Sequence, residues 1–440
     1  MNNKKWMAIL LGGIMAASLA APCSVSAAEK TTLTFWHAMG GTNGEVLQQI
    51  VDDFNASQDE IEIKAEYQGT YDDTITKLKA AMQSDSGLPD VCQMYDVGTK
   101  FMYDSGAVIP VEDKFESTGY DKSSVMEVIS SYYTVDGKQY AMPFNVSTPM
   151  LYYNKDVFEA AGLDPETPPT TYDEVLEDAK KIVESGAAPV GYSQAIYGWF
   201  FEQQLAGLGV TYGNNDNGRK DAVTAVDFDS NGGGLKVFDM WKKLYDSGYF
   251  EDYGTTTADT QTAFFSGQVG MIIESTAILK NAVDSSPFEV GTGYLPRIEQ
   301  NDEGGVIIGG GSLWLTDTGN EANEDAAWKF IEYITTPDVQ AKWSMGTGYF
   351  AINEKAYETE DMKAYLKENP NFETAINQLK DSPVNCNTAG VLSGVQTEAR
   401  LTFNEIMPQV YDGKLTTQDA VDQLAASVNK AIENYNESIK

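Results

Sequence analysis

The sequence predicts an α/β fold of two lobes, each a central β-sheet flanked by helices, with the chain crossing between the lobes at a hinge. Strand and helix patterns alternate between residues 31 and 95, and a second set begins near residue 150. With 440 residues, of which 42% are hydrophobic and 22% charged, the chain is long enough for two or three cores. Two α/β units joined by crossing segments imply a cleft between them, where a ligand meets loops from both sheets.

The first unit is expected to begin with a strand at residue 31. Apolar and polar residues alternate there as in half-buried strands, and the intervening segments space their apolar residues as helices do. This β-α-β-α-β order is typical of a parallel sheet with covering helices. The predicted strands are 31–36, 61–67 and 89–95, and the predicted helices are 45–55 and 74–82.

The second unit and the return to the first are expected over the remaining chain. A triple glycine at 309–311 is flanked by two short apolar runs that predict strands, and the tail predicts one amphipathic helix. The predicted strands are 150–153, 269–273, 306–308 and 312–315, and the predicted helices are 172–185, 199–208, 234–247, 260–266, 322–334, 337–343 and 418–437.

Residues 143–171 have the pattern of a crossing point between lobes. A polar turn at 145–149 leads into the apolar strand 150–153 and then into a brief helical pattern at 156–161. Gly162 suits the left-handed position that ends a helix, and the prolines at 168 and 169 prevent its continuation. The turn at 145–149 is therefore expected to face the cleft.

The first 28 residues predict a secretory signal peptide, with Lys4 and Lys5 before an apolar run and small residues before the cleavage point. Cys23 offers a second possibility, a lipid-anchored protein, but the proline before it departs from the lipoprotein pattern. Removal of this segment leaves Cys92 and Cys386, whose separation in the sequence does not decide whether they pair. The mature protein is expected outside the cytoplasmic membrane.

Charge and residue usage exclude several kinds of function. The net charge of −35 repels nucleic acid and anionic lipid, so neither is expected as a partner. The single histidine, His37, rules out a two-histidine metal site, and no G-x-S-x-G motif accompanies it. We therefore predict no catalytic residue, no metal and no cofactor, and a secreted hydrolase is only a remote alternative.

Several segments together carry a family resemblance. They are Phe35–Met39, Tyr67–Tyr71, Met94–Thr99, Ile307–Trp314, Thr347–Tyr349 and the crossing segment 143–171. In this order the chain resembles the bacterial extracellular solute-binding proteins of ABC importers, carbohydrate type. It is most similar to the branch that binds sn-glycerol 3-phosphate and glycerophosphodiesters such as glycerophosphocholine.

The resemblance implies the bilobed periplasmic-binding-protein fold, known as the Venus flytrap. The expected first lobe is 29–143 plus about 306–346, and the expected second lobe is 144–305 plus about 347–440. A monomer is expected that closes on a small solute and delivers it to the membrane subunits of an ABC permease. Glycerol 3-phosphate or a glycerophosphodiester is the expected solute. A sugar or oligosaccharide is the alternative, including a surface-bound polysaccharide receptor.

The resemblance also implies ligand contacts at particular positions. Asp96 stands where that branch has a glutamate that binds glycerol hydroxyls, and Arg400 matches the arginine that meets the phosphate. Ser147 matches a hydroxyl donor in the crossing turn, and Gly310 a glycine whose amide donates to the ligand. The full expected set is Tyr71, Asp96, Ser147, Ser275, Gly310, Tyr349 and Arg400.

One position departs from that branch. A tryptophan packs over glycerol phosphate there, and the corresponding place in this sequence is Ile196. An isoleucine has less area and no aromatic face, which leaves room for a larger head group or for a sugar stacked on Tyr71, Tyr197 or Trp199. Ile196 and Trp199 are expected in the pocket wall.

Overall fold

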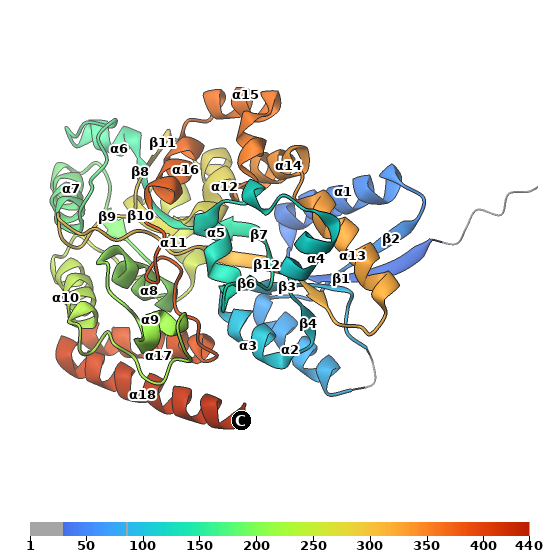
Figure 1. The fold of residues 1–440 in the computed structure, drawn as a ribbon. Helices are drawn as coiled ribbons and strands as arrows, with labels where there is room; N and C mark the ends of the chain where they lie inside the picture. The colour runs from blue at the N-terminus through green and yellow to red at the C-terminus, as the bar shows by residue number, and fades with distance from the viewer. Residues whose placement is uncertain (1–29, 85–86, 440) are drawn as a thin grey trace, which may run out of the picture.

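The computed structural model describes residues 30–84 and 87–439, and the predicted signal peptide with Cys23 lies outside them. Two β-sheets form the centres of two lobes (Figure 1). The first sheet has the order β2-β1-β3-β12-β4, and β7 also pairs with β12. The sequence-based prediction of a bilobed α/β fold is confirmed. The strands of the first sheet are β1 Thr31–His37, β2 Ile61–Tyr67, β3 Val91–Tyr95, β4 Val108–Ile109, β7 Met142–Ser147 and β12 Gly309–Thr316.

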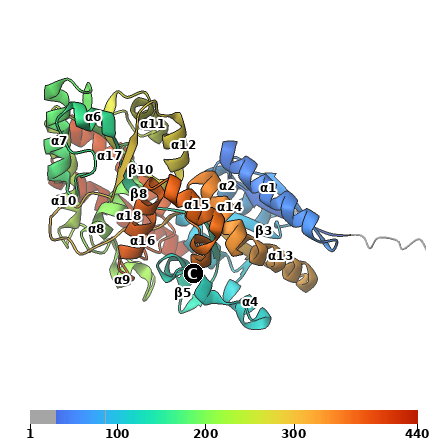
Figure 2. The same ribbon diagram turned by 90° about the horizontal axis from the view of Figure 1, so that it is seen from above.

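The first lobe forms as its sequence pattern predicts. Strand β1 buries Leu33 and Phe35 completely, while the alternate residues Thr34 and Trp36 stay partly exposed. β1 runs parallel to β2 and β3, whereas β12 is antiparallel to β3. The covering helices include α1 Gly41–Ser57, α2 Tyr71–Met82, α13 Glu321–Ile334 and α14 Pro337–Thr347. Figure 2 shows these helices together at one end of the molecule.

The second sheet has the order β11-β8-β10-β9, with the crossing strand β8 inside it. All six residues of β8 are buried, because helices cover both faces of this sheet. Its strands are β8 Pro149–Asn154, β9 Val190–Ser193, β10 Val269–Ser275 and β11 Val290–Gly293. Its helices are α6 Lys155–Ala160, α7 Tyr172–Ser185, α8 Gly198–Gly207, α9 Asn214–Gly218, α10 Gly233–Asp246, α11 Thr257–Phe265, α12 Leu279–Ser285, α16 Asn371–Asp381, α17 Gln396–Tyr411 and α18 Thr417–Ser438.

Small elements not predicted from the sequence fill the gap between β3 and β7 and precede α16. They are too short to show a period, which is why the hydrophobic pattern did not reveal them. They are α3 Thr99–Ser105, β4, α4 Val111–Thr118, α5 Glu127–Ser130, β5 Thr134–Val135, β6 Lys138–Gln139 and α15 Glu360–Glu368. In the second lobe, β9, β11, α9, α12, α16 and α17 were not predicted either.

The chain crosses between sheets where the sequence predicts the hinge. Strand β7 lies in the first sheet and β8 in the second, with Thr148 alone between them. The polar turn predicted at 145–149 is therefore wrong, because residues 145–147 pair with β12 as the end of β7 and Pro149 begins β8. The predicted break comes at Asn154, whose side chain accepts a hydrogen bond from the backbone N–H of Val157 and caps α6. Gly162 adopts the expected left-handed conformation, with φ of 74°.

The structure overturns one prediction and decides one question that the sequence left open. The strand predicted at 306–308 is wrong, because the backbone of Ile307 pairs with the side-chain amide of Gln203 in place of a neighbouring strand. The cysteine pairing that the sequence left open does not form, since Cys92 and Cys386 are both free. Within the part of the chain that the structure describes, no helix combines the length and apolar character needed to cross a membrane.

Candidate ligand site between the lobes

The site forms around Arg400, a buried arginine that joins the two lobes. Arg400 comes from α17 in the second lobe, and its Nη2 donates to Asp96 Oδ2 at 2.8 Å, at the end of β3 in the first lobe. The same guanidinium donates from Nε and Nη2 to the two carboxylate oxygens of Glu202 on α8, both at 2.8 Å. Arg400, Asp96 and Glu202, here called the charge cluster, are exposed by only 8%, 4% and 6%.

The position of Arg400 follows from how closely α8 and α17 approach. A Cβ atom added at Gly198 would lie 2.5 Å from the Cα of Arg400, so only glycine fits at this crossing. Asn404, one turn along α17, accepts a hydrogen bond from the backbone N–H of Gly198 at 2.9 Å. Glu202 lies one turn along α8 from Gly198, which brings its carboxylate to the arginine.

The charge cluster carries one arginine and two acids. Burial opposes the charge on Arg400, but the Asp96 and Glu202 carboxylates outweigh it and hold the arginine pKa well above its usual value. Burial raises the pKa of Glu202, and the neighbouring guanidinium works against this rise. With both acids ionised, the cluster has a net charge of −1. Any ligand anion therefore meets an arginine that is already shared.

Tyrosines surround the charge cluster. Tyr71, the first residue of α2, stacks on Tyr95 with ring centroids 5.0 Å apart and an interplanar angle of 6°. Burial raises the pKa of Tyr71, and nearby Tyr349 and Asp96 raise it further, which places these three residues together. Burial likewise raises the pKa of Tyr197 to about 12, with Arg400 opposing the rise. The wall of the site is thus aromatic and rich in hydroxyls.

Asn145 connects the tyrosines to the hinge strand. Its side-chain N–H donates to Tyr71 Oη at 2.6 Å, and its Oδ1 accepts from Gln93 Nε2 at 2.7 Å. Gly310 pairs with Val146 and has φ of +91°, and a Cβ there would lie 1.9 Å from the carbonyl oxygen of Asn145. Only glycine permits this approach of β12 to β7.

The two predicted serines lie at the same junction. Ser147 ends β7 and is 4% exposed. Ser275 ends β10 opposite Pro149, and its hydroxyl accepts from the N–H of Ala277 at 3.2 Å. Thr276 N–H donates to Thr148 O at 2.8 Å, which fastens the end of β10 to the crossing turn.

The predicted residues therefore divide into two groups. Tyr71, Asp96, Tyr349 and Arg400 are neighbours around the charge cluster, while Gly310, Ser147 and Ser275 belong to the hinge strands beside it. Whether each one contacts a ligand remains a prediction.

The two residues expected in the pocket wall both belong to the buried apolar core of the second lobe. Ile196 is completely buried in the apolar core of the second lobe, and its neighbour Tyr197 is the residue beside Arg400. The ring of Trp199 packs against Gly309, where an added Cβ would lie 2.6 Å from the indole Cζ2. The Trp199 indole N–H is buried without a hydrogen-bond partner among the described residues.

Sequence reasoning missed Glu202 and Asn145. Glu202 did carry a signal, because it is a lone acid in the aromatic and otherwise uncharged helix 198–207. An acid in such surroundings needs a cationic partner. The sequence predicted Asn145 only as part of a polar turn, and no local pattern distinguishes an amide that bridges two elements.

Comparison with known proteins identifies the family. A family model for bacterial extracellular solute-binding proteins matches residues 49–374. The chain is 31% identical over 417 residues to the sn-glycerol-3-phosphate-binding periplasmic protein UgpB of Escherichia coli (strain K12), covering 93% of this chain and 94% of that protein. The chain is a bacterial extracellular solute-binding protein.

Solved structures agree with the fold of this solute-binding protein. UgpB from Mycobacterium tuberculosis in complex with glycerophosphocholine matches with a TM-score of 0.79 at 20% identity, over 92% of this chain and 99% of that one. The cyclic alpha-maltosyl-1,6-maltose binding protein from Arthrobacter globiformis matches with a TM-score of 0.75 at 26% identity, over 92% and 100%. These relatives are binding proteins, and the chain is likewise a binding protein and not an enzyme.

The only histidine shows why a hydrolytic site was a poor candidate. His37 ends β1 with 6% exposure, and burial lowers its pKa to about 4. In the described ranges, no group of three or more His, Cys, Asp and Glu side chains is placed to hold a metal ion.

Proposed function

We propose that this solute-binding protein captures a glycerophosphodiester, such as glycerophosphocholine, between its lobes and delivers it to the permease of an ABC importer. The observation that carries the proposal is the buried charge cluster at the lobe junction, walled by tyrosines. The protein would act as a monomer outside the cytoplasmic membrane after loss of residues 1–28. The proposed moving bodies are 29–143 with 306–346, and 144–305 with 347–440.

Electrostatics favours a diester over glycerol 3-phosphate. A phosphomonoester carries close to two negative charges at neutral pH, whereas a cluster of net charge −1 offers one shared guanidinium. A diester carries a single negative charge, and glycerophosphocholine adds a quaternary ammonium that tyrosine faces attract. Asp96 would accept hydrogen bonds from the glycerol hydroxyls.

A neutral sugar is the second candidate. The specific observation in its favour is that Arg400 already has two carboxylate partners. A guanidinium neutralised in this way does not require an anion, so the site suits the hydroxyl groups of a sugar equally well. Trp199 and the tyrosines would supply stacking surfaces for a pyranose ring.

Calorimetry with glycerophosphocholine, glycerol 3-phosphate and a maltooligosaccharide series separates these candidates. We expect glycerophosphocholine to bind most tightly, and Arg400→Gln to weaken it by about 2–5 kcal/mol because a buried partner of the phosphate is lost. Glu202→Gln should instead strengthen glycerol 3-phosphate binding by about tenfold, or about 1.4 kcal/mol, since a nearby negative charge is removed. Thermal unfolding checks that both variants are folded.

Three results would contradict the proposal. Binding of maltooligosaccharides alone would establish the sugar candidate. An Arg400→Gln variant with unchanged affinity for glycerophosphocholine would place the phosphate elsewhere. Release of choline from glycerophosphocholine at enzymatic turnover would support the hydrolase alternative.

A further inference from the structure

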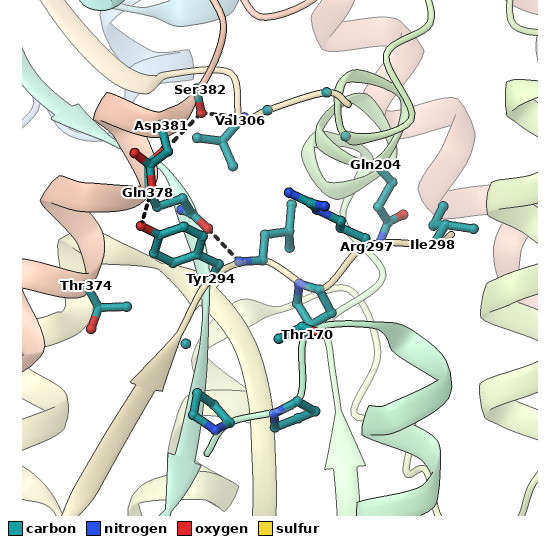
Figure 3. Close-up of a pocket in the computed structure, with 18 of the residues that line it drawn as sticks. Thr170, Gln204, Tyr294, Arg297, Ile298, Val306, Thr374, Gln378, Asp381 and Ser382 are labelled. Carbon is teal, nitrogen blue, oxygen red and sulfur yellow. Dashed lines mark hydrogen bonds between the residues drawn. The ribbon is translucent and has the colours of Figure 1, made fainter. Parts of the chain in front are cut away.

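A cavity lies in the second lobe, apart from the charge cluster. It has a volume of about 530 Å³, within the range of pockets that hold small organic molecules. Its walls come from the segment after β11, from the end of α8 and from α16 (Figure 3). The residues that line it include no member of the charge cluster and no tyrosine of that site. A ligand here would therefore not contact the charge cluster.

The cavity has a largely apolar lining. Close packing fixes one wall, because a Cβ added at Gly293 would lie 2.9 Å from the Cβ of Pro168. Proline rings and branched side chains lose little freedom when they cover a ligand, so such a wall is preorganised for an apolar body. The apolar side chains are Pro168, Pro169, Leu295, Pro296, Ile298 and Val306.

The polar side chains in the deeper walls are already hydrogen-bonded within the protein. Gln204 donates to Tyr172 Oη at 2.8 Å and accepts from Trp241 Nε1 at 2.6 Å. Gln378 donates to the carbonyl oxygen of Pro149 at 2.7 Å. Ser382 accepts from the N–H of Val306 at 3.1 Å. These walls therefore do not need a ligand to satisfy them.

Arg297 is different. Its backbone is fixed on both sides, since its N–H donates to Thr170 O at 2.9 Å and its carbonyl accepts from Tyr172 N–H at 2.9 Å. Arg297 is exposed, and its guanidinium has no hydrogen bond or ion pair to any residue in the described part of the chain, whereas the less accessible Arg219 and Arg400 are hydrogen-bonded within the protein. Figure 3 shows this side chain extending into the middle of the cavity.

A carboxylate on the other side of the cavity limits what Arg297 can accept. Asp381 accepts a hydrogen bond from Tyr294 Oη at 2.7 Å, and Figure 3 shows both side chains across the cavity from Gln204. Arg297 is also near the buried Asp302, because burial raises the pKa of that carboxyl and Arg297 is among the groups that oppose the rise. One guanidinium near two acids, in a chain of net charge −35, disfavours a dianion. A planar monoanion matches the fork of a guanidinium.

We propose that this cavity binds a small monocarboxylate with an apolar body, its carboxylate on Arg297 and its body against the prolines. A ligand whose far end carries a hydroxyl would also reach the carboxylate of Asp381. Phenylacetate has the right parts for a first probe. Acetate lacks the apolar body and phenylacetamide lacks the charge, so each tests one half of the proposal.

The test is saturation-transfer NMR and calorimetry with these three compounds on the full mature protein. We expect phenylacetate to bind more tightly than acetate or phenylacetamide. Arg297→Gln should lower the affinity for phenylacetate about tenfold to a hundredfold, because a charged hydrogen-bonding partner is lost. Lys367→Gln removes an exposed cation outside the cavity, and it should change the affinity for phenylacetate by less than twofold.

Arg297→Gln is expected to fold, since the main chain at this position makes the structural contacts, and an unchanged thermal midpoint checks this. Arg297→Lys should give an intermediate affinity, because it keeps the charge and loses the fork. The proposal is overturned if phenylacetate does not bind the unaltered protein, or if Arg297→Gln binds it equally well.

Discussion

At the scale of single residues, buried charge is what defines this molecule. Arg400 is surrounded by two acids from different elements, and Glu274 is a third buried acid near the hinge, with 4% exposure. Glu274 accepts hydrogen bonds from Gln261 Nε2 at 2.9 Å and from the backbone N–H of Ser275 at 2.7 Å, but it forms no ion pair with any lysine or arginine among residues 30–84 and 87–439. Burial therefore raises its pKa to about 7.

Glu274 makes folding stability depend on pH. Because its folded-state pKa is above the unfolded value, its contribution favours the folded state below about pH 4.5 and is lost as the pH rises through about 7. We expect Glu274→Gln to stabilise the protein by up to about 3 kcal/mol at pH 8, with the gain disappearing near pH 4.5. Urea unfolding of both proteins at several pH values measures this. An equal gain at every pH would contradict the raised pKa.

At the scale of elements, the junction of β7 and β12 sets the geometry of the hinge. The carbonyl of Asn145 occupies the space where a side chain at Gly310 would start. The strand pairing shifts register immediately beyond this point, between Gly311 and Ser312. A bend of this kind re-aims the strand toward the site.

We expect Gly310→Ala to destabilise the protein by about 3 kcal/mol or more and to reduce ligand affinity, because its Cβ overlaps a backbone oxygen. Gly319→Ala is the matched control. That residue also has a positive φ, +70°, but nothing lies within 4 Å of the added atom, so the cost should be only about 1–2 kcal/mol. Denaturant unfolding compares the two. Equal costs would mean that backbone strain alone, and not the overlap, is responsible.

The elements also show what the sequence could reveal. The helix 172–185 was predicted within its observed bounds, since apolar spacing and the Thr171–Glu174 capping box are local signals. The site was only partly predictable. Asp96 and Arg400 came from family resemblance, whereas the pairing of Arg400 with Glu202 depends on how α8 crosses α17, which no local pattern encodes. Ile196 and Tyr197 differ by one position along the chain, and only the packed structure decides which one faces the site.

At the scale of the whole molecule, negative charge is in large excess. There are 65 acidic residues and 30 lysines and arginines, so most acids repel one another with no cation beside them. Many of the ion pairs that do form involve exposed lysines and contribute little, such as Lys414 with Asp412.

Added salt should therefore stabilise this protein. We expect the thermal midpoint to rise by about 2 °C or more between 10 and 200 mM sodium chloride, as the repulsion is screened. A neutral solute at equal osmolarity is the control for general solvent effects. A midpoint that falls with salt would mean that attractive pairs outweigh the repulsion.

The placement of Asp96 on one lobe and of Arg400 with Glu202 on the other has a consequence for selectivity. If the proposed solute binds Arg400, Asp96 competes with it for the same guanidinium, so the solute's own contacts must be stronger than those of this carboxylate. The side chain at position 96 would then determine how strongly a solute must bind in order to displace it from Arg400. A change in the length or charge of this side chain would change which solutes bind, without altering the tyrosines that surround the site.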